Sequence, residues 1–170
     1  MGRKCCFFIG HREATHEIYP ALLAEVERHI REFGVTQFVI GHYGGFDRLA
    51  AEAVMEAKTE HEVIELVLLL PHHPAERPIY KPDGFDYTYY PFGIEKVPQS
   101  VAIVRANRRM VEQADYLIAY VWHTASNAAN LLEYAQRRAG KGLLSITLLK
   151  RADVPCASLS VCSAALYSWE

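Results

Sequence analysis

Residues 36–54 decide the fold, and they read Thr-Gln-Phe-Val-Ile-Gly-His-Tyr-Gly-Gly-Phe-Asp-Arg-Leu-Ala-Ala-Glu-Ala-Val. The apolar and β-branched run 36–40 predicts a buried strand. Three glycines interrupt it, namely Gly41, Gly44 and Gly45. Asp47, the expected N-cap, then opens a run of helix formers. Such a turn places backbone N–H groups where a phosphate or carboxylate can bind. Because the spacing matches no named phosphate-binding fingerprint, a tight connection with purely structural glycines is the alternative.

The same alternation continues along the chain. Apolar runs predict further strands at 4–9, 63–70, 115–122 and 143–149. Apolar residues at helical spacing predict helices at about 18–33, 47–58, 100–113 and 127–139. Strands that alternate with helices are typical of a parallel sheet with right-handed crossovers. We therefore expect an α/β protein with a doubly wound, mainly parallel five-stranded sheet and helices on both faces.

The bulk composition is that of an ordinary globular protein. The chain has 170 residues, of which 51% are hydrophobic and 22% charged, and its net charge is −2. This length fits a single domain, which we place at 1–150, followed by a tail at 151–170. The net charge gives no general case for a nucleic-acid or membrane partner. The longest apolar run, 63–70, is too short to span a bilayer.

The N-terminus and the cysteines indicate a cytoplasmic protein. The apolar stretch after the basic N-terminus stops at Ile9, which makes it too short for a secretory signal. Cys5 and Cys6 fall on opposite faces of the first strand, whereas Cys156 and Cys162 lie in the tail. No cysteine has metal-ligand spacing, so we expect core thiols and no metal site.

The segment 71–99 interrupts the alternation. Its prolines are interspersed with aromatic residues, namely Tyr80, Phe85, Tyr87, Tyr89, Tyr90 and Phe92. A long connection without secondary structure inside a compact domain is often a lid or a binding loop. An aromatic-rich excursion that packs on the surface of the core is the alternative.

The ends of three strands define a candidate site. If the five strands have the order 3-2-1-4-5 in chain numbering, the strands 36–40, 4–9 and 115–122 are neighbours. Ligands of doubly wound sheets bind beyond the carboxyl ends of the strands, near the point where the strand order reverses. The exit loops and one helix supply the candidate ligand-binding residues: Gly10, His11, Arg12, Gly41, Gly44, Gly45, Asp47, Asn107, Ser126 and Asn127.

Asn107 is the candidate from the helix 100–113. It falls on the expected apolar stripe of that helix, which includes Val101, Val104 and Val111. A polar amide on such a stripe needs hydrogen-bond partners, either from the backbone or from a ligand.

Three motifs resemble a known superfamily. They are Phe8-Ile9-Gly10-His11-Arg12, the turn Gly44-Gly45-Phe46-Asp47-x-Leu49-Ala50-Ala51-Glu52, and Asn107-x-x-Met110-Val111 ahead of Asp115. In this order, over residues 5–149, they resemble the SLOG superfamily and, within it, the DUF1273 branch of YspA/YpsA-like proteins. The resemblance implies a Rossmann-like fold and a nucleotide, nucleotide sugar or related phosphorylated compound as ligand. The superfamily also includes the "lonely guy" phosphoribohydrolases and the DNA-processing protein DprA.

The loop after the strand 115–122 departs from this superfamily. The family motif Gly-Gly-Thr-x-Asn corresponds to residues 126–130, which read Ser-Asn-Ala-Ala-Asn. Cβ atoms obstruct the close backbone approach to phosphate that a glycine pair allows. Ser126 and Asn127 can still cap the helix and donate hydrogen bonds. We therefore expect weakened or rearranged phosphate binding here, and we do not transfer phosphoribohydrolase catalysis to this chain.

The favoured function is the binding or sensing of a nucleotide-like phosphorylated ligand, without robust catalysis. In this hypothesis Gly44 and Gly45 hold the anion and Arg12 clamps it through a charge-assisted hydrogen bond. Asn107 and Asp47 read the sugar or the base. No cofactor is implied with certainty, and a homo-oligomer is compatible with the sequence.

Two other functions are compatible with the sequence. A phosphoribohydrolase or N-glycosidase needs a carboxylate at the anomeric carbon, for which Glu52 and Glu133 are weak candidates. A nucleic-acid or protein-binding adaptor would use the aromatic residues of 80–92 and three arginines of the helix 100–113: Arg105, Arg108 and Arg109. The slightly acidic pI of about 6.4 disfavours nucleic acid.

Overall fold

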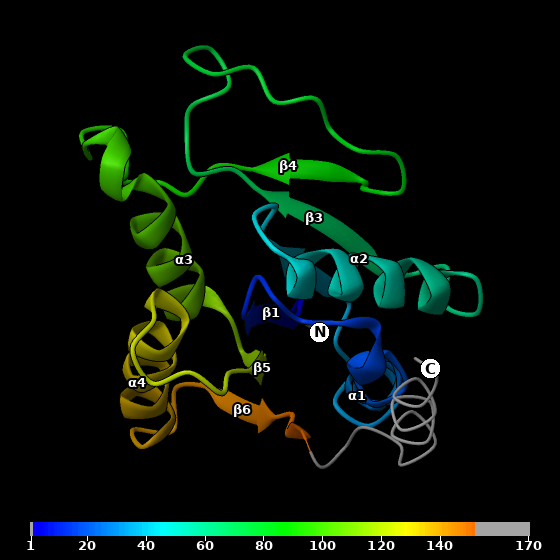
Figure 1. The fold of residues 1–170 in the computed structure, drawn as a ribbon. Coiled ribbons are helices and arrows are strands. Elements are labelled where there is room, and N and C mark those ends of the chain that lie inside the picture. Colours follow the sequence, from blue (N-terminus) through cyan, green and yellow to red (C-terminus); the bar gives the residue numbers. More distant parts are fainter. Residues whose placement is uncertain (1, 152–170) are drawn as a thin grey trace, which may run out of the picture.

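A six-stranded sheet forms the centre of the computed structural model, which describes residues 2–151 (Figure 1). Its strands are β1 (Cys5–Gly10), β2 (Gln37–Ile40), β3 (Glu65–Leu69), β4 (Tyr87–Tyr89), β5 (Tyr116–Tyr120) and β6 (Ser145–Leu148). The order across the sheet is β4-β3-β2-β1-β5-β6, and every neighbouring pair is parallel. The predicted doubly wound, Rossmann-like α/β fold is confirmed, with six strands rather than five.

Four helices cover the two faces of the sheet. They are α1 (Tyr19–Arg31), α2 (Gly45–Lys58), α3 (Ala102–Gln113) and α4 (Asn127–Ala139). Short 3₁₀ turns precede two of them, η1 (His16–Ile18) before α1 and η2 (Gln99–Val101) before α3. Figure 1 shows α1 and α2 on one side of the sheet and α3 and α4 on the other.

The central strand β1 contributes to both hydrophobic cores. Cys6 and Phe8 lie in the core under α1 and α2, whereas Phe7 and Ile9 lie in the core under α3 and α4. A parallel strand that is covered on both faces is apolar along its whole length, which explains the uninterrupted run in the sequence. Cys5 packs against the second core, so the two neighbouring cysteines face opposite sides of the sheet as predicted.

The strand β4 is an addition to the five predicted strands, and it lies within the segment 71–99. Its first residue, Tyr87, is in register with Val67 of β3. The preceding Asp86 accepts the N–H of Leu66 at 2.7 Å and forms an ion pair with Lys58 at 2.6 Å. Three residues at a sheet edge, surrounded by prolines, are too short to show a recognisable alternation.

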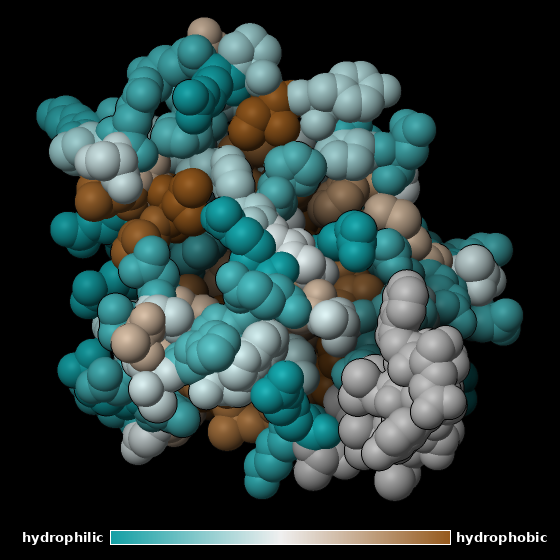
Figure 2. Space-filling view, in the orientation of Figure 1, coloured by the Kyte–Doolittle hydropathy of each residue, from teal (hydrophilic) through white to brown (hydrophobic). Residues whose placement is uncertain are grey.

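The helix α3 buries only part of the predicted stripe, namely Val111. The buried positions are Ala102, Ala106, Met110 and Val111. Val101 and Val104, which we expected on the buried stripe, are 41% and 44% exposed. The prediction for these two valines is wrong, because Ala102 and Ala106 take the buried positions of this part of the chain. Figure 2 shows hydrophobic surface gathered over the N-terminal half of α3.

Two predictions concern the membrane and the C-terminus. Between residues 2 and 151, no helix is both long enough and apolar enough to cross a bilayer. The predicted tail 151–170, with Cys156 and Cys162, lies outside the described residues except for Arg151.

A buried histidine lies on the inner face of α1. The Nδ1–H group of His29 donates to the backbone carbonyl of Glu25 at 2.7 Å, and the ring contacts Phe33 and Tyr116 edge-on. Its Nε2 has no hydrogen-bond partner within residues 2–151, so the core disfavours a proton on this nitrogen. Burial lowers the pKa of His29 from its ordinary value of 6.5, and contact with Glu25 offsets part of the shift.

We therefore expect the protein to lose stability as the pH falls below 6.5. The unfolded His29 binds a proton near its ordinary pKa, whereas the buried side chain resists protonation until the pH is lower. Stability is thus complete above the unfolded pKa and declines below it, by at most about 1.4 kcal/mol per pH unit for one proton.

Chemical unfolding between about pH 5 and pH 8 tests this expectation. His29→Met should show a shallower dependence of the unfolding free energy on pH than the wild type, whereas exposed His42→Gln should retain the wild-type slope. An unchanged slope in His29→Met would show that the acid sensitivity comes from other groups.

Candidate functional site

A cavity of about 400 Å³ lies at the carboxyl edge of the sheet. The exit loops of β1, β2 and β5 form its walls together with α3 and the start of α4. The chain places β2 on one side of β1 and β5 on the other, so the strand order reverses at this point. Doubly wound sheets bind their ligands at such a position.

The structure brings most of the predicted ligand-binding residues together. Those that line the cavity are Gly10, His11, Arg12, Gly41, Gly44, Asp47, Asn107, Ser126 and Asn127. Gly45 is the exception. The convergence of the three exit loops follows from the strand order, and the role of each residue in ligand binding stays a prediction.

The start of α2 differs from the predicted one. The helix begins at Gly45 with Gly44 as its N-cap, so the predicted N-cap role of Asp47 is wrong. Asp47 occupies the third helical position, where its Oδ2 accepts the backbone N–H of Tyr43 at 3.0 Å. A carboxylate at this position that reaches back to the chain before the helix resembles half of a capping box. Asp47 therefore stabilises the turn and also lines the cavity.

The first amides of α2 already have partners within the protein. The N–H of Gly45 donates to the carbonyl of Arg12 at 2.9 Å, and the N–H of Phe46 donates to that of His11 at 3.3 Å. A Cβ atom on Gly45 would lie 2.6 Å from the carbonyl oxygen of Arg12 and 2.7 Å from that of Ala14. Gly45 therefore allows the β1 exit loop to dock on α2, and these two amides are not free to bind an anion.

We expect Gly45→Ala to destabilise the protein by about 1–3 kcal/mol, the usual cost of overpacking. Because alanine is the better helix former, the substitution would stabilise α2 if the β1 exit loop were absent. A loss of stability therefore indicates the contact with this loop. Gly140→Ala is the matched control, because its Cβ would meet its nearest atoms at ordinary distances of 3.6 and 3.7 Å. Chemical denaturation measures the unfolding free energy of both variants. A Gly45→Ala variant as stable as the wild type would contradict the close contact between α2 and the β1 exit loop.

The helix α4 begins at the cavity with two free amides. Ser126 caps it as predicted, since its Oγ accepts the N–H of Ala129 at 3.0 Å and donates to the carbonyl of His123 at 3.1 Å. No residue between 2 and 151 accepts the N–H of Asn127 or Ala128, and both residues line the cavity. Unpaired N–H groups at the positive end of a helix dipole attract anions.

The charged groups of the cavity carry little net charge. Arg12 is exposed, and it forms no ion pair with a carboxylate of the described chain. Glu13 and Asp47 add two carboxylates to the lining. Burial raises the pKa of Asp47 above its ordinary value, and the N–H of Tyr43 offsets part of this shift. One cation beside two carboxylates suits an anion of low charge better than a polyphosphate.

His11 is the buried polar residue of the cavity, with only 5% of its surface exposed. Its Nε2 accepts the backbone N–H of His123 at 3.0 Å, which places the ring proton on Nδ1. The ring meets Trp122 edge-on at 4.4 Å between ring centroids. Burial lowers the pKa of His11 from 6.5, as does the neighbouring imidazole of His123, while Glu13 partly opposes the shift.

One wall of the cavity is apolar. It consists of Ile103 and Val104 from α3 and Leu131 from α4. Ile103 and Val104 are exposed although they are large and apolar. Asn107 lies one turn further along α3 and also lines the cavity, so its amide stands beside this apolar surface. An apolar wall with a few polar groups is typical of small-molecule sites.

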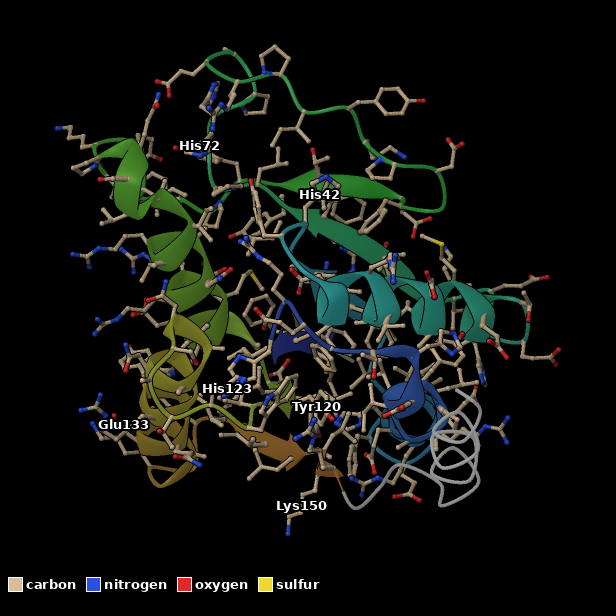
Figure 3. All side chains as sticks on the ribbon, viewed as in Figure 1. His42, His72, Tyr120, His123, Glu133 and Lys150 are labelled. Atoms are coloured by element: carbon tan, nitrogen blue, oxygen red, sulfur yellow. The ribbon has the colours of Figure 1, made fainter. Side chains whose placement is uncertain are left out.

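The two weak catalytic candidates lie outside the cavity. Glu52 faces Arg48 at 3.8 Å on α2, and Glu133 faces Arg137 at 3.9 Å on α4. Figure 3 shows Glu133 on the outer side of α4, away from the labelled residues His123 and Tyr120. The carboxylates that do line the cavity are Asp47 and Glu13. Glu13 belongs to the exit loop 10–13 that we expected at the site, although it was not one of the candidate ligand-binding residues.

Three arginines of α3 belong to a separate hollow of about 220 Å³. They are Arg105, Arg108 and Arg109. Arg108 lies over the ring of Tyr134 at 4.1 Å, and Arg109 forms an ion pair with Glu112 at 2.9 Å. Among the described side chains, no group of three or more His, Cys, Asp or Glu residues is placed to hold a metal ion.

The fold and the cavity define a doubly wound α/β domain with a candidate ligand site at the reversal of its strand order. Comparisons with known protein families and with curated proteins find no match for the chain. The resemblance to the SLOG superfamily therefore stays a prediction that rests on the three sequence motifs.

Proposed function

We propose that this protein binds a nucleotide-like ligand of low charge, such as a nucleoside monophosphate, without robust catalysis. The observation that carries this proposal is the convergence of three exit loops and α3 on one cavity at the reversal of the strand order. A volume of about 400 Å³ suits a compact ligand of this size.

The free amides of α4 and the guanidinium of Arg12 are the groups that suit the phosphate. Asn127 and Ala128 provide two unpaired N–H groups, and Arg12 has no competing carboxylate partner among the described residues. The anion-binding site expected at Gly44 and Gly45 has less support, because the N–H of Gly45 already donates to the carbonyl of Arg12.

The rest of the cavity suits a base and a sugar. Ile103 and Val104 offer an apolar surface for a flat ring, and the amide of Asn107 beside them offers both a donor and an acceptor. Asp47 offers a carboxylate oxygen to a sugar hydroxyl. The two carboxylates that the sequence offered for hydrolysis, Glu52 and Glu133, do not line the cavity.

Thermal shift tests the ligand class directly. A ligand that binds only the folded state raises the melting temperature with its concentration. We expect AMP or another nucleoside monophosphate to raise it more than adenosine, which lacks the phosphate, and more than ATP, whose added charge meets Glu13 and Asp47. A panel in which no phosphorylated compound raises the melting temperature would contradict the proposal. So would release of free base on incubation with a nucleoside monophosphate.

Substitution of Arg12 separates binding from stability. Arg12→Gln should weaken the binding of the best ligand by about 1.5–3 kcal/mol, or roughly 10-fold to 150-fold, because a hydrogen bond to a charged group is lost. The melting temperature without ligand should stay unchanged, since the exposed Arg12 has no ion pair with the described chain.

Arg48→Gln is the matched control for this prediction. Arg48 is an exposed arginine of α2 that does not line the cavity, so its loss should leave calorimetric affinity unaltered. Equal weakening in both variants would indicate a general charge effect rather than a clamp.

A further inference from the structure

Three hydrogen bonds connect the interior of the cavity with the start of α4. The N–H of His123 donates to Nε2 of His11 at 3.0 Å. The carbonyl of His123 accepts the Oγ–H of Ser126 at 3.1 Å, and Oγ of Ser126 accepts the N–H of Ala129 at 3.0 Å. The series joins the exit loop of β1 to the exit loop of β5 and to the first turn of α4, so a side chain of the β1 exit loop contributes to the position of the start of α4.

This series also fixes the protonation state of His11. An Nε2 that accepts a hydrogen bond is unprotonated, so the neutral ring carries its proton on Nδ1. No residue within 2–151 accepts this Nδ1–H group, and His11 lines the cavity. The Nδ1 atom is not fully buried, so its N–H group is open to the cavity, where a ligand oxygen can accept it.

We propose that His11 is the positioning residue of this site: its neutral ring holds the β5 exit loop and thereby the free amides of Asn127 and Ala128 in place for an anion, and its protonation releases them. A protonated ring has N–H groups on both nitrogens, so it repels the N–H of His123 instead of accepting it. The ligand part of this inference rests on the proposed function, whereas the hydrogen-bonded coupling between His11 and α4 does not.

The charged groups around His11 influence the pH at which the hydrogen bonds between His11 and α4 break. The titratable or charged groups that face the ring or its immediate neighbours are Arg12 and Glu13 of the β1 exit loop, His123 of the β5 exit loop, Asp47 of α2, and Arg151 over the ring of Trp122. The residues of α3 and α4 that line the cavity are all uncharged. Burial and His123 lower the pKa of His11 from its ordinary value of 6.5, so the series is intact at neutral pH and breaks only in more acidic solution.

Hydrogen exchange of the ligand-free protein, measured by NMR, tests the coupling. Protection factors, which correct for the intrinsic effect of pH, report the amides of His123 and Ala129. The nitrogen shifts of the His11 ring report its tautomer and its protonation. We expect an Nδ1–H tautomer at neutral pH, and a fall of about tenfold in both protection factors as the ring becomes protonated.

Three substitutions isolate the acceptor of His11. His11→Gln keeps an acceptor oxygen near the position of Nε2 and cannot titrate, so it should retain wild-type protection and lose the pH dependence. His11→Phe keeps a ring without an acceptor, so it should show the reduced protection at every pH. His123→Gln leaves the backbone N–H in place, so it should retain wild-type protection at neutral pH. Because the His123 imidazole lowers the pKa of His11, its removal should move the loss of protection to a higher pH.

Titration of the same samples with inorganic phosphate then tests anion binding at the amides of Asn127 and Ala128. It should shift the amide signals of Asn127 and Ala128 in the wild type and in His11→Gln, and at least tenfold more weakly in His11→Phe. Three outcomes would each overturn the proposal. They are wild-type protection in His11→Phe, a loss of protection in His11→Gln equal to that in His11→Phe, and protection in the wild type that does not depend on pH. Intact coupling without any phosphate effect at Asn127 and Ala128 would instead count against the proposed function and against the anion-positioning role.

Discussion

The docking of the β1 exit loop on its neighbours is the interaction on which the site depends. The carbonyls of His11 and Arg12 accept the first amides of α2, while the N–H of His11 donates to the carbonyl of Tyr120 in β5 at 3.3 Å. One short loop thus holds the elements on either side of the central strand. Because the start of α2 and the end of β5 are both hydrogen-bonded to this loop, these long-range backbone hydrogen bonds help to shape the site.

The fold was largely predictable because hydrophobic periodicity carries most of the information about it. The helix α4 has the predicted bounds, 127–139, since its N-cap serine and its terminal glycine are local signals. The edge strand β4 was not predictable, because its identity depends on pairing with β3 rather than on its own three residues. The buried stripe of α3 was misplaced for a related reason. The valines are the more hydrophobic side chains, but the face of α3 that packs into the core carries Ala106 instead.

It was easier to predict which residues line the cavity than to predict the role of each residue. Strand ends in a doubly wound sheet must meet, so exit loops could be assigned to one cavity from topology alone. Whether an amide is free depends on its distant partners, which no local pattern reveals. Gly44 and Gly45 have the composition of an anion-binding turn, yet the amide of Gly45 is used within the protein. The Ser-Asn start of α4 lacks glycines, yet two amides remain free there. The N-cap of α2 was assigned to Asp47 for the same local reason, whereas tertiary contacts place the cap at Gly44.

Gly10 shows how tightly two distant positions of this chain are linked. A Cβ atom at residue 10 would lie 2.2 Å from the ring of Phe46, so the ring occupies the space that a side chain at position 10 would need. The two positions therefore share one volume across 36 residues of sequence, and a side chain at position 10 requires a change at position 46. Among related sequences we expect them to covary: a chain that carries a side chain at position 10 would carry a smaller residue than phenylalanine at position 46. The pair would then serve as a sequence marker of the docked loop.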